Sequence, residues 1–311
     1  MLHSKNRPRW NALPPQVRDQ IEQLAGGRVL AAENCEGGFS AGFASRLTLA
    51  GGRRLFAKAM DGAAWPLQAG WCRDEARVSA GLPAGIPAPG LRGWSDDGRW
   101  VALVFECIEG REPARPWRPD ELGRAAAAVS AMSLALTPSP VPVPASQPRI
   151  GGWAELAGDR AALGRLAGVS VPAARHLAEL LAFERAGLAA AHGTSLVHFD
   201  VLPHNILCAG HQVWFVDWPH ARLGAPFIDL LMLLGSAGSD GIDLDDLLAA
   251  QPVAAGPDRG TIDAVLAALA GFYLAGALAE TAAAFRPIAA AKLELGRGTL
   301  SWLQRRLGWR A

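Results

Sequence analysis

The stretch from Ser195 to Asp217 reads SLVHFDVLPHNILCAGHQVWFVD and contains the residues that decide the fold. His198 and Asp200 form a His-x-Asp pair, Asn205 follows five residues after Asp200, and Asp217 ends an apolar run. Phosphoryl transfer needs a base that orients the attacking hydroxyl and oxygen ligands that hold Mg²⁺ on the phosphates. Carboxylate and amide oxygens are ligands that suit magnesium. The stretch therefore predicts ATP-dependent phosphoryl transfer, with Asp200 as the base and Asn205 and Asp217 as the Mg²⁺ ligands.

Two short apolar runs within this stretch predict a β-hairpin. Residues 206–208 and 213–216 are apolar and partly β-branched, and Gly210 lies in the turn between them. Such a hairpin places Asn205 at the foot of one strand and Asp217 at the end of the other. We expect both side chains to point to the same place.

Length and composition indicate a globular chain of 311 residues, half of them apolar, which is long enough for two lobes. Lys and Arg number 30 against 29 acidic residues, so no electrostatic footprint for nucleic acid or for an acidic membrane is expected. The longest uncharged apolar run, 264–279, is shorter than the roughly 18 residues of a membrane span and predicts a buried core helix. The amino terminus lacks the apolar stretch of a signal peptide.

Cysteine usage points to a reducing compartment. The four cysteines have no short paired spacing and are Cys35, Cys72, Cys107 and Cys208. This pattern is typical of reduced thiols and not of a disulfide framework. We therefore expect a cytoplasmic protein.

The residues before Glu109 carry strand signals and one main helix, whereas the rest of the chain is mainly helical. We expect a hairpin of residues 46–50 and 53–59 around Gly51-Gly52, a helix over 70–80 and a buried strand over 100–108. Ala-rich stretches predict later helices at 120–136, 172–192, 243–250 and 261–285. The pattern predicts an α+β protein with an N-lobe, 1–109, and a C-lobe, 110–311.

An apolar strand, 55–59, contains Lys58, and an ammonium group is costly to bury without an anion. Glu75 on the following helix is the candidate partner, and the pair would clamp the phosphates of ATP. Upstream, Gly37, Gly38 and Gly42 form a small-residue loop whose backbone N–H groups could approach phosphate oxygens, with Ser40 adding a hydroxyl. Glu106 to Ile108, at the end of the last N-lobe strand, would offer backbone groups to adenine.

The order of these features resembles the aminoglycoside phosphotransferase and choline kinase group, small-molecule kinases that share the protein-kinase fold. The matching motifs are His198 to Asn205 and Val216-Asp217-Trp218, and the resemblance covers roughly residues 30 to 235. It implies a bilobal fold with a small β-rich N-lobe, ATP and Mg²⁺ as cofactors, and a small-molecule hydroxyl acceptor. It also implies that His198 packs the catalytic loop and that Asp229 is a buried brace for it.

Several departures from protein kinases favour a small-molecule site. Phe199 replaces the arginine that reads an activation-loop phosphate, and Trp218-Pro219 replaces Phe-Gly. Only eleven residues, 218 to 228, separate Asp217 from Asp229, which is too few for a long activation segment. The loop at 37–42 does not match Gly-x-Gly-x-x-Gly.

Other interpretations of the same residues stay open at this point. The set His198, His204, Cys208 and His211 contains zinc-ligand types, but its spacing matches no common zinc site. The chain could be a catalytically silent ATP-binding module or, with less support, a protein kinase. The acidic stretch 240–246 could attract a cationic acceptor, or it could be the solvated start of a helix.

Overall fold

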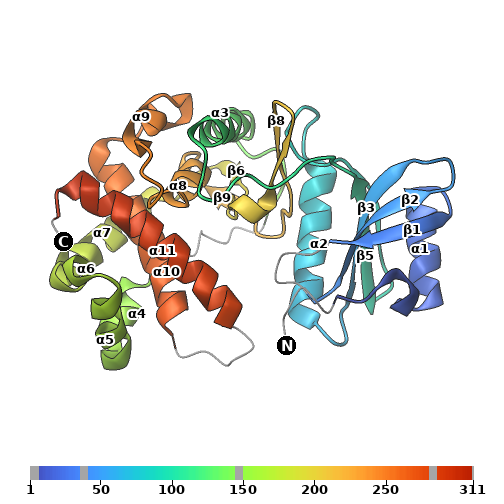
Figure 1. The fold of residues 1–311 in the computed structure, drawn as a ribbon, viewed down its shortest axis with the longest axis horizontal. Helices are drawn as coiled ribbons and strands as arrows, with labels where there is room; N and C mark the ends of the chain where they lie inside the picture. Colours follow the sequence, from blue (N-terminus) through green and yellow to red (C-terminus); the bar gives the residue numbers. More distant parts are fainter. Residues whose placement is uncertain (1–6, 36–40, 144–149, 280–285, 310–311) are drawn as a thin grey trace. The chain divides into compact units, whose positions relative to one another are not determined.

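The computed structural model describes residues 7–35, 41–143, 150–279 and 286–309 (Figure 1). The chain divides into two compact units, which we call the N-terminal unit, Met1–Glu112 with His204–Ala221, and the C-terminal unit, Pro113–Pro203 with Arg222–Ala311. An antiparallel sheet dominates the first and helices dominate the second, which confirms the α+β class.

The N-terminal unit is built on a five-stranded sheet with the strand order β1-β2-β3-β5-β4, in which all neighbours are antiparallel. Its strands are β1 (Val29–Asn34), β2 (Phe43–Leu49), β3 (Arg54–Asp61), β4 (Leu91–Asp96) and β5 (Trp100–Glu106). The turn between β2 and β3 has positive φ at Gly51 (94°) and Gly52 (82°), which glycine adopts without a steric penalty. The hairpin predicted around these two glycines is therefore present.

Helices cover both faces of this sheet (Figure 1). Helix α1 (Pro15–Ala25) buries Val17, Ile21 and Ala25, which recur every four residues and form one stripe. This stripe packs on the strand residues that point to one face, among them Leu47, Leu55, Ala57 and Ala59. Helix α2 (Pro66–Gly81) packs on the opposite face through Ala69, Cys72 and Ala76, against Met60, Val101 and Leu103.

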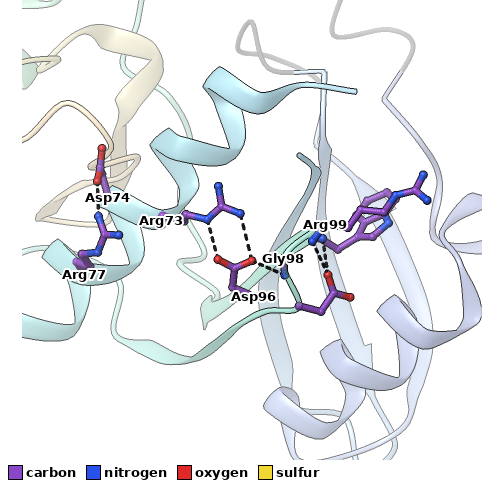
Figure 2. A network of polar contacts seen from close by, with 8 residues as sticks. Arg73, Asp74, Arg77, Asp96, Gly98 and Arg99 are labelled. Carbon is purple, nitrogen blue, oxygen red and sulfur yellow. Dashed lines mark hydrogen bonds and ion pairs between the residues drawn. The ribbon is translucent and has the colours of Figure 1, made fainter. Parts of the chain in front are cut away.

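A polar network also ties α2 to the turn between β4 and β5 (Figure 2). The Arg73 guanidinium donates to both carboxylate oxygens of Asp96, at 2.7 and 3.2 Å. Asp96 in turn accepts the backbone N–H of Gly98 at 3.0 Å. Because Glu75 lies two residues after Arg73, these bonds help to fix the turn of α2 that carries Glu75.

The predicted hairpin of the catalytic stretch is present as β7 (Ile206–Ala209) and β8 (Gln212–Phe215). It belongs to the N-terminal unit although it lies far along the chain. Phe215 N–H donates to the Pro87 carbonyl at 2.7 Å, and Arg111 and Cys208 exchange two backbone bonds of 3.1 and 2.7 Å. These bonds attach the hairpin to the segments before β4 and after β5.

The C-terminal unit consists mainly of helices, with a two-stranded sheet of β6 (Ser195–Val197) and β9 (Arg222–Gly224). Its helices are α3 (Pro119–Ala135), α4 (Trp153–Gly158), α5 (Arg160–Val169), α6 (Val171–Arg175), α7 (Leu177–Ala190), α8 (Ile228–Gly235), α9 (Leu244–Ala249), α10 (Arg259–Leu278) and α11 (Arg286–Leu307). Short 3₁₀ turns occur in both units: η2 (Trp10–Ala12) lies in the N-terminal unit, η4 (Pro252–Ala254) lies in the C-terminal unit, and η3 (Pro203–Asn205) lies where the chain passes from one to the other.

Helix α10 is the core helix of the C-terminal unit. It has 20 residues, and its most apolar 18-residue window has a mean hydropathy of 1.7, so by length and composition it could cross a membrane. However, 78% of its most apolar window is buried inside the protein, against helices such as α7 and α11. This burial agrees with the core helix predicted from the apolar run at 264–279.

Gly42 has no room for a side chain, which yields a stability prediction. A Cβ there would lie 2.6 Å from the Ala59 carbonyl oxygen and 2.6 Å from Met60 Cε. We expect Gly42→Ala to lower the free energy of unfolding by about 1–3 kcal/mol, because the backbone of β3 must shift. Gly70→Ala in α2 is the control, since nothing lies within 4 Å of its Cβ position, and we expect it to be neutral or to stabilise by about 0.5–1 kcal/mol. Urea unfolding measures both, and equal effects would contradict the packing argument.

Candidate active site

Three charged side chains predicted from the sequence meet in the N-terminal unit. The Lys58 ammonium, on β3, donates to both Glu75 carboxylate oxygens, at 2.7 and 2.9 Å. It also donates to Asp217 Oδ1 at 2.6 Å. The Lys58 side chain is 18% exposed and that of Glu75 is 4% exposed, whereas that of Asp217 is 45% exposed. The lysine thus joins a buried carboxylate on α2 to an accessible one that follows β8.

The sheet dictates this arrangement. Side chains alternate along β3, so Phe56, Lys58 and Met60 point to the face that α2 covers. Burial alone would lower the pKa of Lys58, but the charges of Asp217 and Glu75 outweigh it and raise that pKa. Lys58 is therefore a fixed cation at any physiological pH.

Asp217 has an unusual backbone that orients its side chain. Its φ is +70°, in the left-handed region that Asp visits more readily than most residues. The next residue, Trp218, is 2% exposed, and its indole N–H donates to the Phe215 carbonyl at 2.9 Å. A backbone hydrogen bond from Trp218 also reaches Glu75. Trp218, the residue after Asp217, is thus bonded both to Phe215 and to Glu75.

A cavity of about 210 Å³ opens beside these three side chains, and the residues that line it all belong to the N-terminal unit. Lys58, Glu75, Asn205 and Asp217 line its polar part. Its apolar lining comes from Ala44, Phe56, Pro89, Phe105, Ile108, Leu207 and Val216. A polar end with fixed charges beside apolar walls suits a ligand with a flat apolar part and an anionic part.

The expected adenine contacts lie on this cavity too. Both Glu106 and Ile108 line it. The Glu106 side chain accepts from Arg92 at 2.7 Å, and its backbone N–H donates to the Gly90 carbonyl at 2.9 Å. Glu106 is therefore braced at the end of β5, while the chain continues as the cavity wall through Cys107 to Ile108.

The glycine loop is described only at its end. Gly37, Gly38 and Ser40 lie outside the described residues. Gly42 directly precedes β2, and its close approach to Ala59 explains why a glycine is needed there. It is not among the residues that line the cavity, whereas Cys35 and Ala44 on either side of the loop are.

Asn205 and Asp217 suit a magnesium ion. The Val216 N–H donates to the Asn205 carbonyl at 2.9 Å, so the residue before Asp217 is bonded to Asn205, as the predicted hairpin requires. One amide and one carboxylate are enough for Mg²⁺, which keeps waters and takes phosphate oxygens as its remaining ligands. Within the described ranges, no group of three or more His, Cys, Asp or Glu side chains is placed to hold a metal.

His198 and Asp200, which the sequence predicts to lie in the catalytic loop, belong to the C-terminal unit. Asp229, at the start of α8, is fully buried and accepts the backbone N–H groups of His198 at 2.7 Å and Phe199 at 2.9 Å. Burial raises the pKa of Asp229 to about 6, although the two N–H bonds oppose this shift. Phe199 has a φ of +61°, which costs a bulky residue about 1–2 kcal/mol. Asp229 holds this backbone in place directly before Asp200, which is half-buried.

The acidic stretch 240–246 has structural partners. Asp240 accepts the Trp117 N–H at 2.9 Å, and Asp243 caps α9 by accepting the N–H groups of Asp245 and Asp246. The Asp245 carboxylate is paired with Arg306. Capping and ion pairing therefore account for most of these carboxylates.

Two features of the cavity were not predicted from the sequence. Arg7 lines it, although nothing in the sequence near the amino terminus marks this residue. Phe56 and Phe105 also line it, and the alternation along β3 could have indicated Phe56, because it lies on the same face as Lys58.

Comparison with known proteins agrees with these features. A family model described as the phosphotransferase enzyme family matches residues 35–265. No protein with a curated description matches the chain.

Solved structures of low sequence identity share the fold. Spectinomycin phosphotransferase APH(9)-Ia, in complex with ADP and spectinomycin, is 12% identical with a TM-score of 0.60, over 92% of this chain and 98% of that one. Aminoglycoside phosphotransferase APH(4)-Ia, with AMP-PNP and hygromycin B, is 14% identical with a TM-score of 0.55, over 93% and 99%. Macrolide 2'-phosphotransferase MphH from Brachybacterium faecium is 19% identical with a TM-score of 0.53, over 90% and 98%. These likenesses confirm the fold expected from the motifs.

The Lys58 cluster generates a prediction about stability and pH. In Lys58→Met, the carboxylates of Glu75 and Asp217 lose the cation between them, so we expect a loss of about 3 kcal/mol near neutral pH. Burial already raises the pKa of Glu75 in the wild type, where the charge of Lys58 opposes the shift, and without Lys58 we expect that pKa to rise further. Such a group stabilises fully below its unfolded pKa and loses that contribution as pH rises through its folded pKa. The difference in the free energy of unfolding between wild type and Lys58→Met should therefore grow as pH rises.

Urea unfolding of wild type and Lys58→Met at pH 5 and pH 8 measures this difference. Arg99→Met is the matched control, because the Arg99–Asp61 ion pair has an arginine side chain that is 66% exposed. A deficit that stays constant between the two pH values would contradict the coupling of Lys58 to Glu75.

Proposed function

Since the family model spans well over half of its length, the chain belongs to the phosphotransferase enzyme family, and we propose that it transfers the γ-phosphate of ATP to a hydroxyl group of a small molecule. The observation that carries this proposal is the contact of Lys58 with both Glu75 and Asp217 at the edge of a partly apolar cavity.

The cavity of the N-terminal unit would bind the nucleotide. Adenine would lie against the apolar walls, and the backbone of Glu106 and Ile108 would donate to and accept from its edge. Lys58, oriented by Glu75, would bind phosphate oxygens. The loop with Gly38, Ser40 and Gly42 would lie over the phosphates.

Magnesium would be held by Asn205 and Asp217. The ion neutralises the developing charge on the phosphates, and the other ligands would be phosphate oxygens and water. Asp217 would exchange part of its contact with Lys58 for the metal, which frees the ammonium to bind phosphate.

Asp200 would orient the acceptor hydroxyl and accept its proton. Asp229 would support this role by fixing the backbone of His198 and Phe199, and the buried His198 would pack the loop. In this proposal residues 1–109 serve as the nucleotide-binding lobe and residues 110–311 supply the catalytic loop and the acceptor-binding helices. The protein would act in the cytoplasm, without nucleic acid or membrane as a partner.

Candidate acceptors are hydroxyl compounds that resemble the small molecules bound by the structural relatives. Three of those relatives were solved with spectinomycin, hygromycin B and gentamicin, and another is an amicoumacin kinase. Since most of the acidic stretch 240–246 has structural partners, it gives little support to a polycationic acceptor.

A coupled assay of ADP release with this panel tests the proposal. We expect one hydroxyl compound to stimulate turnover and the product to gain one phosphate by mass spectrometry. Asp200→Asn should lower that turnover 10²–10⁴-fold, as the loss of a general base does, while ATP affinity stays unchanged. Asp19→Asn, an exposed carboxylate on α1, is the matched control.

The rival functions give different results. A silent ATP-binding module would bind Mg-ATP without stimulation by any acceptor, and a protein kinase would phosphorylate protein and not the panel. If Asp200→Asn retained turnover within tenfold of wild type, the role of Asp200 would be wrong.

A further inference from the structure

The segment of residues 7–13, which precedes α1, is attached to the sheet beside the cavity. The Asn34 side-chain amide donates to the carbonyls of Arg7 and Pro8, both at 3.5 Å. Ser45, fully buried on β2, donates its hydroxyl to Asn34 Oδ1 at 2.8 Å and so orients that amide. The backbone before α1 is therefore bound to the ends of β1 and β2 that flank the glycine loop.

A second anchor lies three residues further along. The Trp10 ring packs on the ring of Phe43, with centroids 5.9 Å apart, and Phe43 is 1% exposed in the core beneath α1. Two anchors, one polar and one aromatic, therefore fix the backbone on either side of Arg9. The segment of residues 7–13 therefore packs on the sheet, and this packing fixes the position of Arg7, its first residue.

The Arg7 side chain enters the cavity. It is half-buried and lines the cavity together with Cys35, Lys58 and Asp217. Burial lowers the pKa of Arg7, and the charges of Asp217 and Cys35 oppose this shift. A guanidinium stays protonated in such surroundings, so the cavity contains a second fixed cation near Asp217.

Its neighbours place Arg7 at the polar end of the cavity. Cys35 directly precedes the glycine loop, and Asp217 is the carboxylate bonded to Lys58. Arg46 also lines the cavity, and its charge, like that of Cys35, acts on Cys107, next to the expected adenine contacts. Arg7 and Lys58 are thus two cations of the cavity lining whose charges interact with that of Asp217.

We propose that Arg7 is a phosphate-binding residue of the nucleotide site, which binds the polyphosphate of ATP together with Lys58. A guanidinium presents two parallel N–H groups that match phosphate oxygens, while an ammonium acts as a point charge. Once Asp217 turns to a metal ion, both cations near it need new anions, and the polyphosphate supplies them. This inference rests on the proposed function and adds a group from outside the matched residues 35–265.

The inference predicts a selective loss of affinity. In Arg7→Gln, the Kd for ATP with Mg²⁺ should rise about ten- to a hundredfold, the usual value of a charge-assisted hydrogen bond. The Kd for adenosine should stay within twofold, because adenosine has no phosphate. Arg7→Lys should recover part of the ATP affinity, since it restores the charge but not the paired N–H groups. Titration calorimetry on the full chain gives each Kd.

Two further variants separate binding from structure. Arg9→Gln is the matched control, because Arg9 is exposed two residues away and should bind ATP like wild type. Asn34→Ala removes the bond that fixes the Arg7 backbone and should weaken ATP binding in the same direction but less. Thermal melts check that every variant is folded.

The outcomes that overturn the inference are distinct from those that overturn the proposed function. If Arg7→Gln has the same Kd for ATP as wild type, or if its affinities for ATP and adenosine fall equally, Arg7 does not bind phosphate. The proposal of a nucleotide site is unaffected by either result. If the wild-type chain binds neither ATP nor adenosine, the proposed function fails, and this inference fails with it.

Discussion

An ammonium group held between two carboxylates is the interaction on which the N-terminal unit depends. Lys58 lies on β3, Glu75 lies on α2, and Asp217 lies two residues after the end of β8. Neither the half-buried lysine nor the buried glutamate can be left without a partner. Their pairing therefore requires that the helix and a hairpin encoded more than a hundred residues later meet the sheet at one place.

Each unit also has a strained backbone position next to the residues proposed to carry the chemistry. Of the residues described, two that are not glycine have positive φ, Phe199 and Asp217, and each lies beside or at a proposed catalytic position. Strained backbone persists only where the surroundings over-determine it. Asp229 fixes one site through two N–H bonds, and the buried Trp218 fixes the other. Each of these two strained residues is therefore held by contacts within its own unit.

Short-range signals in the sequence predicted much of this structure. The Gly51-Gly52 turn, the hairpin before Asp217 and the helix with Glu75 follow from local patterns, and the need of a buried lysine for an anion predicted the Lys58–Glu75 contact. What the sequence could not show depends on contacts between distant segments. The attachment of Phe215 to Pro87 is a backbone bond without a side-chain signature. Likewise, Arg7 lines the cavity, and its backbone carbonyl accepts from the side-chain amide of Asn34, which lies 27 residues away in the sequence. Helix α1 was also missed, although its four-residue spacing of apolar side chains was readable.

The central claim is that this cluster is a site for Mg-ATP, in which Asp217 exchanges lysine for metal. Calorimetric titration of ATP into wild-type protein and Asp217→Asn, each with and without Mg²⁺, tests it most directly. The account predicts that Mg²⁺ tightens ATP binding to wild type at least tenfold, the order of one charge-assisted contact, and that Asp217→Asn loses this gain. ATP binding that is equally tight without Mg²⁺, or an unchanged magnesium effect in Asp217→Asn, would contradict it.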